Sequence, residues 1–195
     1  MIKLFYATQS SGKQANMLER LKDLPIELIF PNKMMDIDEN GTTEIENAII
    51  KASAYSNTIH TPILAADSGM YFEDTRLKSP QLFVKRNNGK ELSNKELIEY
   101  FKALAQKNGG KIKAYYKTGI ALVVNNCLYT TQIIEEPFYI MDKSSDNYNN
   151  KMLDSISFSI KQNKYFSEFD NLNFKSEDEK FKAELINFLR GHLSF

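Results

Sequence analysis

The chain has 195 residues, of which 42% are hydrophobic and 26% charged, and its 25 basic and 25 acidic residues leave no net charge. This composition predicts a single globular domain over residues 1–195 and argues against a coat for nucleic acid polymers, which needs a basic excess. No apolar run approaches the ~20 residues that span a membrane. Only one cysteine is present, and no signal-peptide pattern opens the chain, so we expect a cytoplasmic protein.

Strands and helices alternate along the first third of the chain. The apolar patterns predict strands at about residues 2–7, 24–30 and 62–66. They predict a helix that follows the first loop and runs to about residue 22, with Leu18 and Leu21 on its buried side, and a second helix at about residues 44–58. In the second helix, apolar residues recur at i, i+3, i+4 and i+7 and mark a core face, namely Ile45, Ala48, Ile49 and Ala52.

The later part of the chain predicts helices around a strand pair. Ser93 and Glu96 form a capping box for a helix to about residue 106. Two long strands, 113–124 and 128–140, meet at Asn125-Asn126, which suits a tight hairpin turn. A loop follows over 142–151, and residues 176–179 cap a last helix to about 190. The whole pattern predicts an α/β fold with a mixed sheet flanked by helices.

The first loop has the composition of a phosphate site. Small polar residues and a glycine between a strand and a helix leave backbone N–H groups free, and a lysine adds positive charge. The residues concerned are Thr8, Gln9, Ser10, Ser11, Gly12 and Lys13. An ordinary strand–helix turn with Ser10 or Ser11 as the N-cap explains the same residues.

The helix predicted from residue 44 carries polar groups beside its core face. Asn47 and Lys51 are four residues apart and share a side of the helix. The carboxylate of Glu46 is a donor that Mg²⁺ accepts. Thr43 and Glu46 also form a capping box, however, so Glu46 could serve only its own helix.

Asp67 follows a short buried strand. Polar residues at the ends of strands in an α/β sheet line the usual ligand crevice, and a carboxylate there can bind a metal or act as general base. The following residues, Ser68 and Gly69, make the segment equally suited to a turn.

In this order the motifs resemble the inosine triphosphate pyrophosphatase family. Its A-T-N-N-x-G-K loop corresponds to residues 7–13, its E-x-G-x-T-F-x-E-N-A-x-x-K-A motif to residues 39–52, its A-D-D-S-G to residues 65–69 and its A-P-G-x-Y-S-A-R to residues 79–86. The resemblance is good over residues 1–90 and extends through the hairpin to about residue 140.

The resemblance implies hydrolysis of nucleoside triphosphates, in particular of the noncanonical purines (ITP, dITP or XTP), to a monophosphate and pyrophosphate. It implies Mg²⁺ held by Glu46 and Asp67, with Asp67 activating water. It also implies a homodimer, an elongated fold with the site in a cleft between two lobes, and no nucleic acid or membrane partner. The residues implied to hold the substrate are Thr8, Gln9, Ser10, Ser11, Gly12, Lys13, Asn47, Lys51, Ser68, Gly69, Arg86 and Lys180.

The chain also departs from the family pattern. Ala66 replaces the first acid of the Asp-Asp pair, and Gln9 and Ser10 replace the paired asparagines. The base-recognising F-G-Y-D-P has only a poor echo at residues 152–156, and the late S-H-R is missing. Two alternatives therefore stay open: a catalytically impaired nucleotide-binding or protein-interaction module on the same fold, and a pyrophosphatase for another nucleotide.

Overall fold

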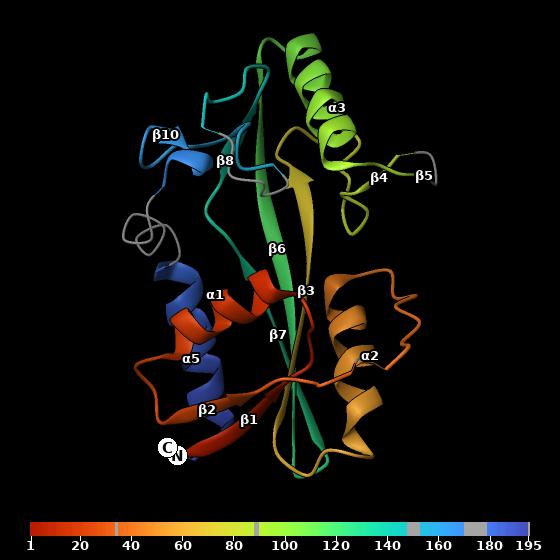
Figure 1. Cartoon of the computed structure of the whole chain (residues 1–195), viewed down its shortest axis with the longest axis vertical. Helices are drawn as coiled ribbons and strands as arrows, with labels where there is room; N and C mark the ends of the chain where they lie inside the picture. The colour runs from red at the N-terminus through yellow and green to blue at the C-terminus, as the bar shows by residue number, and fades with distance from the viewer. Residues whose placement is uncertain (34, 88–89, 148–152, 170–178, 195) are drawn as a thin grey trace. The chain divides into compact units, whose positions relative to one another are not determined.

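The computed structural model describes residues 1–33, 35–87, 90–147, 153–169 and 179–194 (Figure 1). The chain divides into two compact units, each assembled from separate segments. The first comprises Met1–Ser68, Lys117–Ile133 and Phe181–Phe195, and the second comprises Gly69–Tyr116 and Ile134–Lys180. Two long strands, β3 (Ile63–Phe72) and β6 (Lys111–Val124), contribute residues to both units.

The sheet of the first unit begins with parallel pairs. Strand β1 (Ile2–Tyr6) pairs in parallel with β2 (Ile26–Ile29) and with the start of β3. Strand β6 lies next to β3, and β7 (Cys127–Ile134) pairs with β6. The turn between β6 and β7 has φ of 49° at Asn125 and 63° at Asn126. This left-handed pair of asparagines is what a two-residue hairpin requires, and it confirms the predicted turn.

Helices cover both faces of this part of the sheet. Side chains of a strand alternate between its faces. On one face Leu4 and Tyr6 of β1 pack with α1 (Ser11–Leu21) and α5 (Glu179–His192). On the other face Phe5 and Ala65 pack against Ala48 and Ala52 of α2 (Glu44–Ser56), as the predicted core stripe of that helix required.

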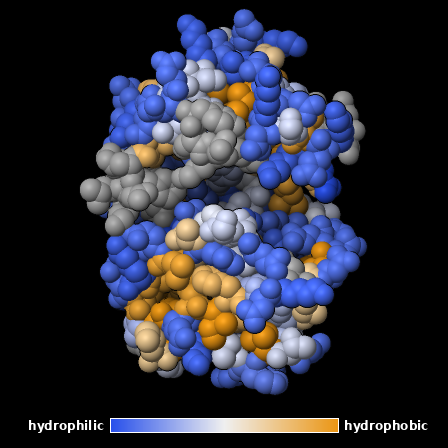
Figure 2. Space-filling model, in the orientation of Figure 1, coloured by the Kyte–Doolittle hydropathy of each residue, from blue (hydrophilic) through white to orange (hydrophobic). Residues whose placement is uncertain are grey.

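One predicted core position of α1 is wrong. Met17 and Leu21 are buried, whereas Leu18 is exposed. Met17 and Leu21 are four residues apart and share a helix face, and Leu18 lies about 100° around the helix from Met17. Figure 2 shows apolar residues gathered over the part of the first unit where α1, β1 and β2 lie, while most of the remaining visible face is hydrophilic.

The second unit is antiparallel. Strand β8 (Phe138–Met141) pairs with residues 111–114 of β6 and with β9 (Ser157–Ser159), which pairs with β10 (Lys164–Tyr165). Helix α3 (Asn94–Lys107) begins with the predicted capping box, and its Leu97 and Phe101 join a core with Phe72 and Phe138. The unit is completed by a short strand pair, β4 (Arg86–Asn87) with β5 (Lys90–Glu91), and a 3₁₀ turn, η1 (Phe166–Glu168).

Two predicted strand boundaries are wrong. The strand predicted over 128–140 is broken after Ile134, and β8 begins only after Pro137, which has no N–H to donate to a ladder. Strand β3 does not end at Ala66, because residues 67–69 continue it despite their turn-like composition. The loop after residue 142 is present over 142–147.

The α/β class with an open mixed sheet flanked by helices is confirmed. The predicted cap of the last helix falls on residues 176–178, outside the described residues, and α5 is described from Glu179. Among the described helices none is long and apolar enough to cross a membrane.

Candidate active site

Asp67 is the centre of a cluster of polar side chains in the first unit. One carboxylate oxygen, Oδ1, lies 3.1 Å from Lys51 Nζ and 3.7 Å from Lys13 Nζ. The other, Oδ2, accepts a hydrogen bond of 3.0 Å from Asn47 Nδ2. The Asp67 side chain keeps 15% of its exposure, so the carboxylate is sheltered but still reachable from solvent.

The fold explains why these groups meet. Asp67 lies three residues beyond Leu64, the last β3 residue paired with β1, and so stands past the carboxyl end of a parallel strand, where α/β sheets bind ligands. Asp67 shares the strand face of Ala65, which is covered by α2. Asn47 and Lys51 project from one side of α2, and α1 supplies Lys13 from its first turn.

Asn47 and Lys51 are buried, with 4% and 6% exposure. Lys51 Nζ has three acceptors: Asp67 Oδ1, Glu39 Oε2 at 2.8 Å and the Ala66 carbonyl oxygen at 3.5 Å. An ammonium group has three N–H donors, so the protein engages all of them. The burial of this lysine follows from these contacts, since a lysine is almost never fully buried without partners.

Glu39 is a site residue that the sequence reasoning missed. Its carboxylate and that of Asp67 share the ammonium of Lys51. The loop that carries it is anchored where Gly41 N donates to Asn47 Oδ1 at 2.9 Å. A Cβ on Gly41 would lie 2.6 Å from that same oxygen, so only glycine allows this approach. The sequence held one indication of this role, because Glu39 is an acidic residue two positions before Gly41.

Electrostatics keep the Asp67 carboxylate ionised. Burial favours its neutral form, but the charges of Lys51 and Lys13 together with the Asn47 hydrogen bond outweigh burial and lower the pKa of Asp67. The pKa of Lys13 is also lowered, first because surrounding protein desolvates its ammonium and then because Lys51 is a like charge nearby. Asp67 is therefore suited to face a metal ion or a polarised water.

Glu46 caps the helix that also carries Asn47 and Lys51. Its Oε2 accepts hydrogen bonds from Thr42 N at 2.6 Å, Thr42 Oγ1 at 2.7 Å and Thr43 N at 3.2 Å. These bonds, the Thr42 hydroxyl first, lower the pKa of Glu46. The capping box is thus present, and the role of Glu46 as a metal ligand stays a prediction.

The first loop forms the expected helix start. Ser10 caps α1 by accepting a hydrogen bond from Lys13 N at 3.4 Å, and the buried Thr8 accepts one from Ser10 N at 3.3 Å. Gln9, Ser11 and Gly12 are exposed. The loop therefore supplies both an N-cap and an accessible helix N-terminus of the kind that attracts phosphate.

Ser68 points away from Asp67, because adjacent strand residues face opposite sides of the sheet. Its hydroxyl lies 2.8 Å from that of Thr118 on β6, a contact that the sequence did not suggest. Ala66 lies on this same face, within the core beneath α1 and α5. The acid absent at position 66 would thus stand on the face opposite Asp67.

The remaining predicted residues belong to the second unit. Gly69 is an interior residue of β3, Arg86 is exposed at the start of β4, and Lys180 is exposed on α5. The roles of these three residues stay predictions. In the segment that weakly matches the base-recognition motif, Met152 lies outside the described residues, and Leu153 and Ile156 are buried among the apolar residues of the second unit.

Comparison with known proteins identifies the family of this chain. Residues 4–166 match the model of the Ham1 family. The chain belongs to the Ham1 family. In this Ham1 chain the match extends over both units, from β1 to the first residue of η1.

Relatives with assigned names match parts of this Ham1 chain. It is 35% identical over 128 residues to a dITP/XTP pyrophosphatase from Coxiella burnetii, covering 64% of each chain. It is 39% identical over 72 residues to a dITP/XTP pyrophosphatase from Aquifex aeolicus, covering 37% of this chain and 36% of the relative. These matches thus span less than two thirds of the relatives' lengths.

Solved structures match over nearly the whole chain. A HAM1 protein from Coxiella burnetii is 26% identical with a TM-score of 0.78, covering 98% of this chain and all of that one. The Ham1 protein of Staphylococcus aureus is 22% identical with a TM-score of 0.74 over 98% of this chain and all of that one, which shows the fold alone.

Gly12 offers a test of the loop as a ligand site. A Cβ added there meets nothing within 4 Å, so the fold itself does not require glycine. We expect Gly12→Ala to leave stability unchanged or raise it by up to about 1 kcal/mol, because alanine favours helix. If phosphate approaches this backbone, the added methyl group should hold the phosphate away from the backbone N–H groups and weaken a charged hydrogen bond. KM for a nucleoside triphosphate should then rise about 10-fold or more. An unchanged KM would show that the ligand does not approach the loop.

Proposed function

We propose that this Ham1 chain is a Mg²⁺-dependent nucleoside triphosphate pyrophosphatase that converts noncanonical purine triphosphates (ITP, dITP or XTP) to the monophosphate and pyrophosphate. The observation that carries the proposal is the Asp67 carboxylate held between two lysines beside the N-terminus of α1. The names of the relatives support the choice of substrate.

The chemistry assigns a separate task to each side chain. A water oxygen attacks the α-phosphorus, the bond from this phosphorus to the bridging oxygen of the β-phosphate breaks, and pyrophosphate leaves. Asp67 accepts the proton of the attacking water. Lys51 is engaged by three protein acceptors and therefore positions Asp67 and Glu39 rather than gripping phosphate.

Lys13 and the start of α1 hold the triphosphate in this proposal. The Lys13 side chain is 42% exposed and its ammonium lies 3.7 Å from Asp67 Oδ1, which is long for an ion pair, so it can turn toward an incoming phosphate. The N–H groups at the helix start add partial positive charge in the same place. A lysine in this setting binds phosphate as a point charge.

The residues present fit a magnesium ion. Mg²⁺ takes oxygen ligands and is usually bound through one or two carboxylates plus substrate phosphates. Asp67 and Glu39 would supply such oxygens, since both contact the same ammonium group of Lys51. Bound there, the ion would neutralise phosphate charge. Glu46, the metal ligand predicted from the sequence, uses only Oε2 in the capping bonds described and would bind the ion through Oε1.

Two matched variants test whether Glu39 or Glu46 is the carboxylate that binds the metal together with Asp67. Glu39→Gln and Glu46→Gln each remove one negative charge, and glutamine can still cap a helix. We expect Glu39→Gln to lower turnover at limiting Mg²⁺ by about 10-fold or more, as loss of a supporting metal contact does. Glu46→Gln should change turnover by no more than about twofold, as surface substitutions do. The measurement is pyrophosphate release against Mg²⁺ concentration. The reverse order of effects would restore Glu46 as the ligand.

The activity itself is tested with purified protein, Mg²⁺ and a panel of nucleoside triphosphates, with pyrophosphate and monophosphate measured together. The proposal requires equal amounts of both products and the highest kcat/KM for ITP, dITP or XTP. Release of inorganic phosphate in place of pyrophosphate would contradict it.

Two alternatives have specific support. Ala66 removes one acid of the motif and the family's base-recognition motif is absent, which favours either a nucleotide-binding or protein-interaction module without catalysis, or a pyrophosphatase for another nucleotide. Nucleotide binding without product release would favour the module, and fast release from a different triphosphate would favour the other enzyme.

We also propose a cytoplasmic homodimer without nucleic acid or membrane partners, as the resemblance implies. Light scattering during gel filtration measures the mass directly, and a particle with the 22.5 kDa mass of one chain would contradict the dimer.

A further inference from the structure

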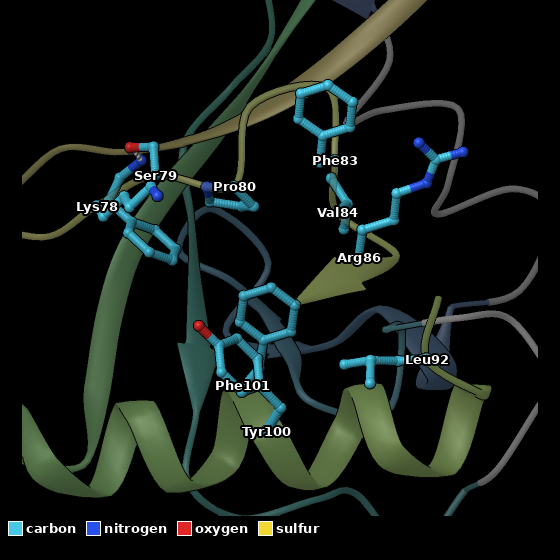
Figure 3. Close-up of a pocket in the computed structure, with 10 residues that line it drawn as sticks. Lys78, Ser79, Pro80, Phe83, Val84, Arg86, Leu92, Tyr100 and Phe101 are labelled. Carbon is cyan, nitrogen blue, oxygen red and sulfur yellow. Dashed lines mark hydrogen bonds between the residues drawn. The ribbon is translucent and has the colours of Figure 1, made fainter. Parts of the chain in front are cut away.

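The second unit has a cavity of its own, with a volume of about 510 Å³. This volume lies within the range of small-molecule sites. It opens between α3 and the segment that precedes β4, as the close-up in Figure 3 shows. Apart from Ser79, its lining residues have either an apolar chain, an aromatic ring or a positive charge. The lining residues that carry the argument are Lys78, Ser79, Phe83, Arg86, Tyr100 and Phe101.

The cavity wall is held in place before any ligand arrives. Gln81 exchanges two backbone hydrogen bonds with Met70 of β3, at 2.9 and 3.0 Å. The Ser79 hydroxyl accepts a third bond from Phe72 N at 2.8 Å. The floor consists of buried core residues, Phe72 and Phe101 among them. Binding here would therefore require little ordering of the protein, which lowers its entropic cost.

Two large aromatic side chains of the cavity remain exposed. Phe83 keeps 55% of its surface accessible and Tyr100 keeps 40%. They come from opposite walls, Phe83 from the segment before β4 and Tyr100 from α3. Exposed rings on two sides of a cavity offer stacking surfaces to a flat ligand, because an aromatic face attracts another ring.

The charges of the cavity have one sign. Among the described lining residues the charged ones are Lys78 and Arg86, both cations. Neither has a carboxylate within ion-pair distance in the part of the chain that the structure describes. Figure 3 places Lys78 and Arg86 toward opposite ends of the cavity, with Phe83 and the rings of α3 between them. The ligand that complements this arrangement is an anion with an aromatic body.

We propose that this cavity is a binding site for a nucleoside monophosphate, with the base stacked on Phe83 and Tyr100 and the phosphate on Lys78. The anionic aromatic class follows from the lining residues. The choice of a mononucleotide rests on the proposed function, whose product is such a molecule. The cavity would thus let the second unit sense the product of the reaction.

The test uses the full chain with Lys13→Ala, which weakens the proposed phosphate contact of the first unit, and isothermal titration with inosine monophosphate. We expect Lys78→Gln to weaken binding about 10-fold, the loss of one charged hydrogen bond. Phe83→Ala should weaken it about 5- to 10-fold, the loss of one stacking partner. Lys95→Gln, an exposed lysine of α3 that does not line the cavity, is the matched control and should stay within about twofold.

Two further probes separate the parts of the ligand. Inosine lacks the phosphate and inorganic phosphate lacks the ring, so each should bind more weakly than inosine monophosphate. Equal affinity of inosine monophosphate for the Lys78→Gln, Phe83→Ala and Lys95→Gln proteins would overturn the proposal, as would no binding at all.

Failure of the proposed function would look different. Monophosphate binding that depends on Lys78, in a protein that releases no pyrophosphate from any triphosphate, would support the proposed binding site and contradict the proposed enzymatic activity. Pyrophosphate release, together with monophosphate binding that does not depend on Lys78, would support the proposed enzymatic activity and contradict the proposed binding site.

Discussion

Asp67→Asn should lower the turnover of the proposed reaction by roughly 10²–10⁴, the usual contribution of a general base. The variant keeps the size of the side chain and can still hydrogen-bond Asn47, but it loses the charge that pairs with Lys51 and Lys13. An amide accepts a proton poorly and binds metal weakly. Steady-state pyrophosphate release at saturating Mg²⁺ and substrate measures the effect.

The control for this variant is Asp74→Asn. Asp74 is a half-buried acid of the second unit paired with Arg76 at 2.7 Å, so its replacement also removes one ion pair and one charge. Turnover of the control should stay within about twofold of the wild type, as for other surface changes. Circular dichroism confirms that both variants fold. Wild-type turnover in a folded Asp67→Asn protein would remove Asp67 from the mechanism.

The pH dependence gives a second readout of the same residue. Because the pKa of Asp67 is lowered in the folded state, its ionised form contributes stability above the unfolded pKa, and this contribution is lost as the pH falls through the folded pKa. As the pH is lowered, activity should accordingly be lost only below the pH at which an ordinary aspartate becomes protonated. Asp67→Asn should remove this part of the acid dependence of stability.

The sequence predicted the elements of the site better than their contacts. The capping box of α2 and the asparagine turn between β6 and β7 depend on neighbours in the chain, so local patterns suffice to find them. The ion pair between Lys51 and Glu39 joins residues whose meeting depends on how a loop packs on α2. No periodicity encodes such a contact, and Glu39 was missed for that reason.

For Glu39 the sequence reasoning identified no role, whereas for Glu46 the local sequence is compatible with two. Its capping role and its metal role use the same carboxylate; the local sequence favours the cap, and the resemblance implies the metal. The structure gives the capping contacts, and only the resemblance supports the metal. Asn47 and Lys51 were placed correctly on one side of α2, but their burial could not be read from polar residue types, which are usually exposed.

The strand alternation of β3 gives a physical reason why the missing acid need not abolish activity. Ala66 faces the core beneath α1 and α5, and Ser68 lies on the same side of the strand, while Asp67 faces α2. Replacement of the acid by alanine thus leaves the pairs of Asp67 with Lys13, Asn47 and Lys51 in place. The chain retains the charge arrangement that the proposed reaction uses most directly.

Gly119→Ala should have the second large effect, on stability and activity together. Gly119 lies where β6 passes the first turn of α2, and a Cβ there would lie 2.7 Å from the Glu44 carbonyl oxygen and closer still to Ile45 N. These are backbone atoms and cannot rotate away. Overpacking of this kind costs typically about 1–3 kcal/mol. Displacement of α2 would also separate Asn47 and Lys51 from Asp67, so turnover should fall with stability.

The matched control for this change is Gly191→Ala on α5, where an added Cβ meets nothing within 4 Å. It should leave the free energy of unfolding unchanged or raise it slightly, because alanine favours helix. Urea unfolding of both variants and pyrophosphate release at a temperature where both remain folded measure the two effects. A Gly119→Ala protein as stable and active as Gly191→Ala would mean that α2 can shift on the sheet without disturbing the site. Loss of activity with unchanged stability would instead mean that the position of α2 matters to the chemistry more than to the fold.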